Sequence, residues 1–198
     1  MSKSPQVSII LTSYNHTKYL RYAIDSALDQ SFTDFELIIW DDASTDNSWD
    51  IIQSYDDPRI RAFRNKINKR VGNARKAILE VVTGEYVAIH SSDDIWEPDK
   101  LKKQVAFLED NPQIGAVFSW AQIIGEDGKP LIDKFHPYNN IFEQPNRTRH
   151  EWLNFFFYHG NALCHPSLLI RKICYQDCGA YRYGFAQLPD FDMWVRLC

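Results

Sequence analysis

Short apolar runs alternate with segments of helical spacing over about the first 125 residues, and this alternation constrains the fold more than any other feature. The apolar runs have the length of buried strands and cover residues 7–11, 35–40, 60–63, 86–89 and 116–124. Apolar residues recur at helical spacing within residues 19–28, 49–55, 74–82 and 101–108. This order predicts an α/β fold, with a mostly parallel central sheet and helices on both faces.

The alternation ends near residue 130. Residues 131–150 are polar, contain several Pro and Asn residues, and are expected to form a long loop. A helix over 150–158, a strand over 167–170 and a helix from residue 189 should follow. We therefore predict one domain over residues 1–198. Because the helical pattern is still running at Cys198, we also expect the domain to be truncated at its C-terminus.

Composition and charge exclude several other classes of protein. The 22 Lys and Arg residues against 26 Asp and Glu residues argue against a nucleic-acid binder, which would present a basic face. No stretch approaches the ~20 apolar residues of a membrane span, and no signal peptide precedes the first predicted strand. A cytoplasmic protein is expected. Its four cysteines lack the spacing of a zinc site and are expected to be buried free thiols.

Polar clusters follow three of the predicted strands. They are residues 12–16 (TSYNH), 41–46 (DDASTD) and 91–94 (SSDD). Ligands of open α/β sheets bind beyond the carboxyl ends of the strands, so these clusters mark the expected site. Two of them contain adjacent carboxylates, whose mutual repulsion a divalent cation such as Mg²⁺ would offset. The glycine-rich dinucleotide and P-loop motifs are absent, which leaves a nucleotide diphosphate held through a carboxylate-bound metal.

The ordered set of VSIILTSYN at residues 7–15, DDASTD at 41–46 and SDD at 92–94 resembles the signature of family 2 glycosyltransferases, which have the GT-A fold. The resemblance implies an inverting transfer from a nucleotide-diphosphate sugar, often UDP-linked, with Mg²⁺ or Mn²⁺. It also implies a nucleotide-binding half over about residues 1–125 and an acceptor-side half over about 126–198. The acceptor would be a glycan, a lipid-linked sugar or a small molecule.

The resemblance assigns roles to individual residues. Those expected to contact the nucleotide are Thr12, Ser13, Tyr14, Asn15, Asp42, Ser44, Arg75, Ser92 and Asp93. Tyr14 would stack on the base, and the acceptor-only carboxylate of Asp42 would bond the base edge. Asp94 would ligate the metal directly, with Asp93 and His165 close to it. The family usually has an acid where Ser91 stands, which leaves one carboxylate fewer for the metal.

The segment LPDFDMWVR, residues 188–196, resembles the family's segment that carries the general base. Pro189 replaces the usual Glu, and Asp190 keeps the position of the expected catalytic base. An inverting transfer needs one carboxylate to deprotonate the acceptor hydroxyl. Acceptor recognition is expected within residues 130–165, where aromatic residues cluster. A lipid-linked acceptor would bring the protein to the inner membrane face.

Other interpretations remain open at this point. Taken singly, the acids could cap helices or turns, and Tyr14 could belong to the core. The chain could also be a non-catalytic nucleotide-sugar-binding domain or an inactive fragment of an enzyme. A sugar-phosphate nucleotidyltransferase would share the architecture, but the glycine- and arginine-rich signature of that class does not follow the first strand.

Overall fold

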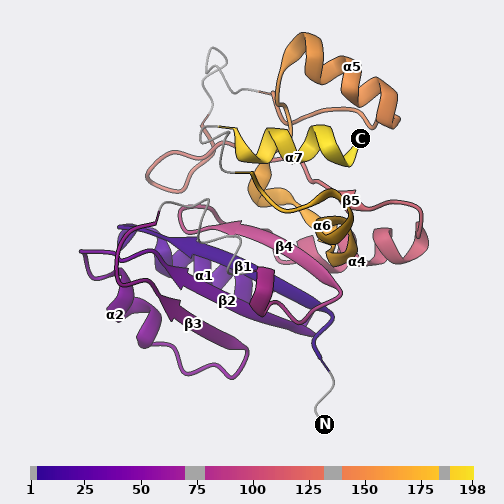
Figure 1. Ribbon diagram of the computed structural model, residues 1–198. Helices are drawn as coiled ribbons and strands as arrows, with labels where there is room; N and C mark the ends of the chain where they lie inside the picture. Colours follow the sequence, from indigo (N-terminus) through magenta and orange to yellow (C-terminus); the bar gives the residue numbers. More distant parts are fainter. Residues whose placement is uncertain (1–3, 70–78, 132–139, 183–187) are drawn as a thin grey trace.

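A six-stranded sheet forms the centre of the molecule (Figure 1). The computed structural model describes residues 4–69, 79–131, 140–182 and 188–198. The strands lie in the order β3-β2-β1-β4-β6-β5. They are β1 (Val7–Ser13), β2 (Phe35–Asp41), β3 (Ile60–Arg64), β4 (Tyr86–Ser91), β5 (Ala116–Val117) and β6 (Leu169–Arg171). Strands β1 to β4 pair in parallel and β6 runs antiparallel to both of its neighbours, so the mostly parallel sheet is as predicted.

Helices cover both faces of this sheet (Figure 1). They are α1 (Leu20–Leu28), α2 (Ser48–Gln53), α4 (Lys100–Asp110), α5 (Arg149–His159), α6 (Lys172–Cys178) and α7 (Pro189–Leu197). Because successive strand residues point to opposite faces, Ile9 and Leu11 pack with α1, α2 and α4, whereas Ile10 packs with Met193 and Trp194 of α7. Both faces of β1 are therefore buried, as its unbroken apolar run requires.

The strand expected over residues 116–124 is much shorter in the structure. Only Ala116 and Val117 pair with β6. The ladder stops because its partner turns away: residues His165–Ser167 form a 3₁₀ turn, and the Ser119 amide donates to the hydroxyl of Ser167 at 3.1 Å. The strand expected over 167–170 accordingly begins only at Leu169.

The remaining helices and the cysteines differ from the expectations as follows. The helix predicted over residues 74–82 falls mostly outside the described residues. Helix α6 was not predicted, since it is a single short stretch directly after β6. The four cysteines are free thiols, as expected, but they are half-buried rather than buried. Among the described residues, no helix is both long and apolar enough to cross a bilayer.

Candidate active site

The three polar loops expected to form the site lie side by side at one edge of the sheet. Strand β1 lies between β2 and β4, and the register pairs Thr12 with both Trp40 and Ser91. The three parallel strands therefore end level with one another, and the loops that follow them begin at the same edge.

The first two loops are bonded to each other. The Asn15 amide donates to the hydroxyl of Ser44 at 3.0 Å, and the side-chain oxygen of Asn15 accepts from the Thr45 amide at 2.8 Å. Asn15 and Ala43 both have a positive φ, 55° and 63°, which the two tight turns require. Tyr14 remains 43% exposed, so its ring is available to a ligand. Asn15 and Ser44 thus build the wall of the expected nucleotide site.

The two acids at the end of β2 have different surroundings. Asp41 is fully buried, and its carboxylate accepts from the Ser44 amide at 3.0 Å and pairs with the Arg64 guanidinium at 3.2 Å. Asp42 is 4% exposed and accepts from the side-chain amide of Asn65 at 2.6 Å and from the Lys69 amide at 2.9 Å. Both bonds use the same carboxylate oxygen of Asp42. Asp41 therefore anchors the turn, whereas Asp42 faces the loop that follows β3.

The third loop carries the acidic pair that follows β4. Asp93 is exposed and Asp94 is half-buried. Burial raises the pKa of Asp94, and the neighbouring charge of Asp93 raises it further. A hydrogen bond from Ser91 and the nearby His16 act in the opposite direction. A bound cation would stabilise the charged form of Asp94, because it would offset the effects of burial and of the neighbouring Asp93 charge.

The residues present fit a hard divalent cation in part. The paired carboxylates supply the oxygen ligands that Mg²⁺ and Mn²⁺ prefer. Within the described residues, however, no group of three His, Cys, Asp or Glu side chains is placed to hold a metal ion. The Nε2 atom of His165 lies 2.9 Å from the hydroxyl of Tyr181. A cation at Asp93 and Asp94 would therefore need further ligands from outside this cluster, as the phosphates of a bound nucleotide could provide.

Residues 160–167 lie between this loop and α7 and contact residues on both sides. The side-chain amide of Asn161 donates to the Asp190 carboxylate at 3.2 Å. The Pro166 carbonyl accepts from the indole of Trp96, two residues after Asp94, and burial together with the charge of Asp94 raises the pKa of the nearby Cys164 thiol to about 12. One segment thus contacts both the expected general base and the surroundings of the acidic pair.

The same segment is fixed to the start of α4. The indole of Trp96 donates to the Pro166 carbonyl at 3.0 Å, and the side-chain amide of Gln104 donates to the Ser167 carbonyl at 2.8 Å. These bonds hold the segment against the region that directly follows the acidic pair.

The remaining expected residues are placed as follows. Thr12 is half-buried at the end of β1, and Ser13 is buried, with its carbonyl accepting from the Asp42 amide at 2.9 Å. Ser92 is buried and bonded to His16. Arg75 lies outside the described residues. His16 and Asn161 were not among the expected site residues. His16 belongs to a polar cluster that the sequence does show, whereas no sequence signal marks Asn161.

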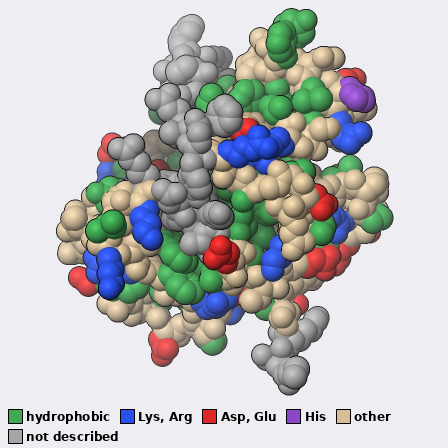
Figure 2. All heavy atoms as spheres, in the orientation of Figure 1, with side chains coloured by type: hydrophobic (Ala, Val, Ile, Leu, Met, Phe, Trp, Pro, Cys, Tyr) green, Lys and Arg blue, Asp and Glu red, His purple; other side chains and the backbone are tan. Residues whose placement is uncertain are grey.

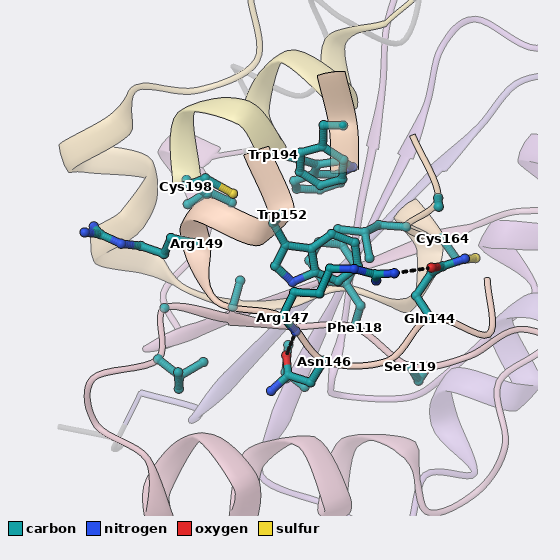
Figure 3. A pocket seen from close by; sticks show the side chains of 18 of the residues that line it. Phe118, Ser119, Gln144, Asn146, Arg147, Arg149, Trp152, Cys164, Trp194 and Cys198 are labelled. Atoms are coloured by element: carbon teal, nitrogen blue, oxygen red, sulfur yellow. Dashed lines mark hydrogen bonds between the residues drawn. The ribbon is translucent and has the colours of Figure 1, made fainter. Parts of the chain in front are cut away.

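A cavity of about 580 Å³ lies between β5, α5 and α7 (Figure 3). Its aromatic lining includes Phe118, Trp152, Phe156 and Trp194. The guanidinium of Arg147 lies 4.8 Å from the Trp152 ring centroid at the cavity wall. Figure 2 shows further hydrophobic side chains on the surface over α5, where Phe157 and Tyr158 are 83% and 76% exposed. The cavity therefore lies in the half where acceptor recognition is expected.

Comparisons with known proteins identify the family of the chain. The family model described as "Glycosyl transferase family 2" matches residues 8–171. The putative glycosyltransferase EpsE of Bacillus subtilis is 32% identical over 99% of this chain and 68% of its own length. WfaP of Escherichia coli, a UDP-Glc:α-D-GlcNAc-diphosphoundecaprenol β-1,3-glucosyltransferase, is 40% identical over 52% of this chain and 41% of its own length.

Solved structures show the same fold. Residues 1–349 of S. aureus TarS, in complex with UDP-GlcNAc, superpose with a TM-score of 0.74 at 22% identity, over 96% of this chain and 54% of that fragment. The mannosyltransferase PcManGT of Pyrobaculum calidifontis, in complex with GDP-Man and Mn²⁺, gives a TM-score of 0.67 at 17% identity, over 97% of this chain and 51% of that protein. The chain thus spans between 41% and 68% of the length of these proteins. The expected GT-A fold is confirmed, and the chain belongs to glycosyl transferase family 2.

Proposed function

We propose that this chain binds a nucleotide-diphosphate sugar, most simply a UDP-sugar, and transfers the sugar with inversion to an acceptor hydroxyl. One observation carries the proposal. The loops after β1, β2 and β4 meet at one edge of the sheet, and the segment that contacts Asp190 is also bonded to Trp96, two residues after Asp94. Donor-binding groups and a candidate base are thereby gathered in one region.

The donor would lie across the three loops. The exposed ring of Tyr14 is suited to stacking on the base, and the carboxylate of Asp42, although only 4% exposed, would bond the base edge. Asp93 would contact the ribose or the donor sugar. UDP-Glc in the name of WfaP and UDP-GlcNAc bound to TarS support a uridine nucleotide.

Asp93 and Asp94 would hold Mg²⁺ or Mn²⁺, with His165 nearby. When bound, the cation would stabilise the negative charge that develops on the leaving diphosphate. The Mn²⁺ in the PcManGT complex supports this part of the proposal. Because the cation takes over the stabilisation of the leaving group, the protein needs a carboxylate only on the acceptor side.

Asp190 would supply that carboxylate. Its side chain is held by Asn161 at the first turn of α7. The carboxylate could take the proton from the acceptor hydroxyl while the hydroxyl oxygen attacks the sugar carbon from the face opposite the leaving diphosphate. The aromatic cavity beside α7 supports an acceptor with apolar surface. WfaP acts on a diphosphoundecaprenol acceptor, and a lipid-linked acceptor of that kind would bring this cytoplasmic reaction to the inner membrane face.

The test is Asp190→Asn, with Asp110→Asn at the exposed end of α4 as the control. Asp190→Asn should lower the rate of sugar transfer by about 10²–10⁴-fold, the usual contribution of a general base. Its affinity for UDP, measured by calorimetry, should stay within twofold of the wild type. Full transfer activity in Asp190→Asn would exclude this residue as the base.

A non-catalytic nucleotide-sugar-binding domain is the second candidate, favoured by Pro189 in place of the family's usual Glu. It would bind UDP-sugars with Mn²⁺ yet neither transfer nor hydrolyse them. Measurement of both activities in the wild-type chain distinguishes the two functions.

A further inference from the structure

His16 has a backbone that is fixed on two sides. Its amide donates to the hydroxyl of Ser48 at 3.1 Å, and its carbonyl accepts from the amides of Tyr19 and Leu20 at 3.0 and 2.9 Å. These bonds tie the end of the first loop to the start of α2 and to the start of α1. The position of the His16 side chain is therefore set by the framework of the expected nucleotide site.

The imidazole of His16 reaches the third loop. Its Nδ1 atom lies 2.7 Å from the hydroxyl oxygen of Ser92, a residue 76 positions later in the chain. Ser92 is 3% exposed and directly precedes Asp93 and Asp94. This bond crosses from the loop after β1 to the loop after β4, which are neighbours because the two strands pair in parallel.

The bond acts where the third loop needs support. Two adjacent carboxylates repel each other, and a loop that carries them can relax by moving them apart unless its backbone is held. Ser92 is the residue through which the start of this loop is held to the first loop. A cation and a nucleotide diphosphate bound at the same edge would each depend on how these two loops are placed relative to each other.

We propose that His16 is a positioning residue that couples the nucleotide loop to the acidic pair, so that Mn²⁺ and UDP each strengthen the binding of the other. The proposal rests on the function proposed above, since it assumes that both ligands bind at this edge. Coupling of this kind is reciprocal, and it is measured as the factor by which saturating Mn²⁺ lowers the Kd for UDP.

The experiment is calorimetric titration of UDP with and without saturating MnCl₂. It compares the wild type with His16→Ala, Ser92→Ala and the double variant. His16→Ala should reduce the coupling factor about fivefold or more, while the Kd for UDP without metal stays within twofold. Ser92→Ala should reduce the coupling factor to the same extent, whatever its effect on the metal-free Kd as an expected nucleotide contact, and the double variant should have no smaller a coupling factor than either single variant, because both remove one bond.

Two further variants separate positioning from a general loss of structure. His16→Asn retains a polar atom close to the place of Nδ1 and should recover most of the coupling. His150→Ala, at an exposed position on α5, should leave it unchanged. Circular dichroism checks that each variant is folded. If His16→Ala does not fold, Ser92→Ala and His16→Asn carry the same comparison.

Three outcomes would overturn the inference: an unchanged coupling factor in His16→Ala, equal weakening of UDP binding with and without Mn²⁺, or additive losses in the double variant. If Mn²⁺ does not change the affinity of the wild type for UDP, both the metal dependence in the proposed function and the coupling inferred here are refuted. That result is separable, because it appears in the wild type before any variant is made.

Discussion

Lys100, the first residue of α4, is a buried lysine whose replacement should stabilise the protein. Its side chain donates to the side-chain oxygen of Gln104 at 2.9 Å and lies 3.9 Å from the ring centroid of Trp96. The residue is only 8% exposed, and no carboxylate in the described part of the chain forms an ion pair with it. Burial lowers the pKa of Lys100 from 10.5 to about 7, although the nearby Cys164 opposes this change. The folded state therefore binds this proton more weakly than the unfolded chain.

The size of the effect follows from proton linkage. One pH unit corresponds to about 1.4 kcal/mol, so a fall in pKa from 10.5 to about 7 costs about 5 kcal/mol at pH 6, where the lysine is charged in both states. Between pH 7 and 10.5 the unfolded chain binds the proton and the folded protein does not. The cost therefore falls as the pH rises, to about 2 kcal/mol at pH 9.

Lys100→Met keeps the length of the side chain and removes the charge. It leaves the side-chain oxygen of Gln104 without its donor, which costs about 1–3 kcal/mol at any pH. The variant should therefore be about 3 kcal/mol more stable than the wild type at pH 6 and about equally stable at pH 9. For a chain of this size, 3 kcal/mol corresponds to a rise in Tm of about 6–12 °C.

Urea denaturation at pH 6, 7, 8 and 9 measures this difference. Other groups that titrate in this range are common to both proteins and cancel in the comparison. Lys102→Met, at an exposed position on the same helix, should change the stability by less than about 0.5 kcal/mol at every pH. The reasoning is refuted if Lys100→Met is less stable than the wild type at pH 6, or if the difference between them does not shrink towards pH 9.

Three further substitutions test the framework. Gly84→Ala would place a Cβ atom 2.6 Å from the backbone nitrogen of Ser8, so the free energy of unfolding should fall by about 1–3 kcal/mol. An unchanged urea midpoint would show that the backbone of β1 can shift without a loss of stability. Thr148→Ala removes the capping box with Glu151 and should lower the free energy of unfolding by about 1 kcal/mol; an unchanged Tm in thermal denaturation would contradict this. The buried carboxylate of Glu36 accepts from the hydroxyl of Ser8 at 2.6 Å. Burial alone would raise the pKa of Glu36, but its hydrogen bonds lower it overall, so its stabilisation holds above about pH 4.5 and is lost as the pH falls. Glu36→Gln should therefore lose less stability than the wild type between pH 5 and pH 3, and equal losses would exclude this role.

The parallel strands were accessible from the sequence because their unbroken apolar runs agree with their burial in the structure. The run of apolar residues in β1 and β2 can be satisfied only by strands covered on both faces, which a parallel sheet provides. The apolar run after Ala116 has the same appearance, yet it pairs over two residues only. Its length depended on a competing bond between Ser119 and Ser167, which are 48 residues apart, and no local pattern reports such a bond.

The candidate site shows the same division. That the three loops share one edge follows from the rule for parallel strands and needed no coordinates. The bonds that hold the loops did need them. His16 with Ser92, and Asn161 with Asp190, are contacts between distant segments whose formation depends on strand register and on the path of residues 160–167. The sequence therefore predicted that these loops share one edge of the sheet, but not which of their residues support the others.

The direction of β6 explains how the second half of the chain reaches the edge of the sheet where we propose that the donor binds. Strand β6 runs antiparallel to β4, so it enters the sheet at the end where β4 leaves it. The segment that precedes β6, with Cys164 and His165, must then lie beside the acidic pair that follows β4. A parallel strand in the same place would have put this segment at the opposite edge. Because Asn161 in that segment contacts Asp190 at 3.2 Å, the antiparallel direction of β6 brings the candidate base towards the proposed donor site, and the bonds from Trp96 and Gln104 hold the segment in place.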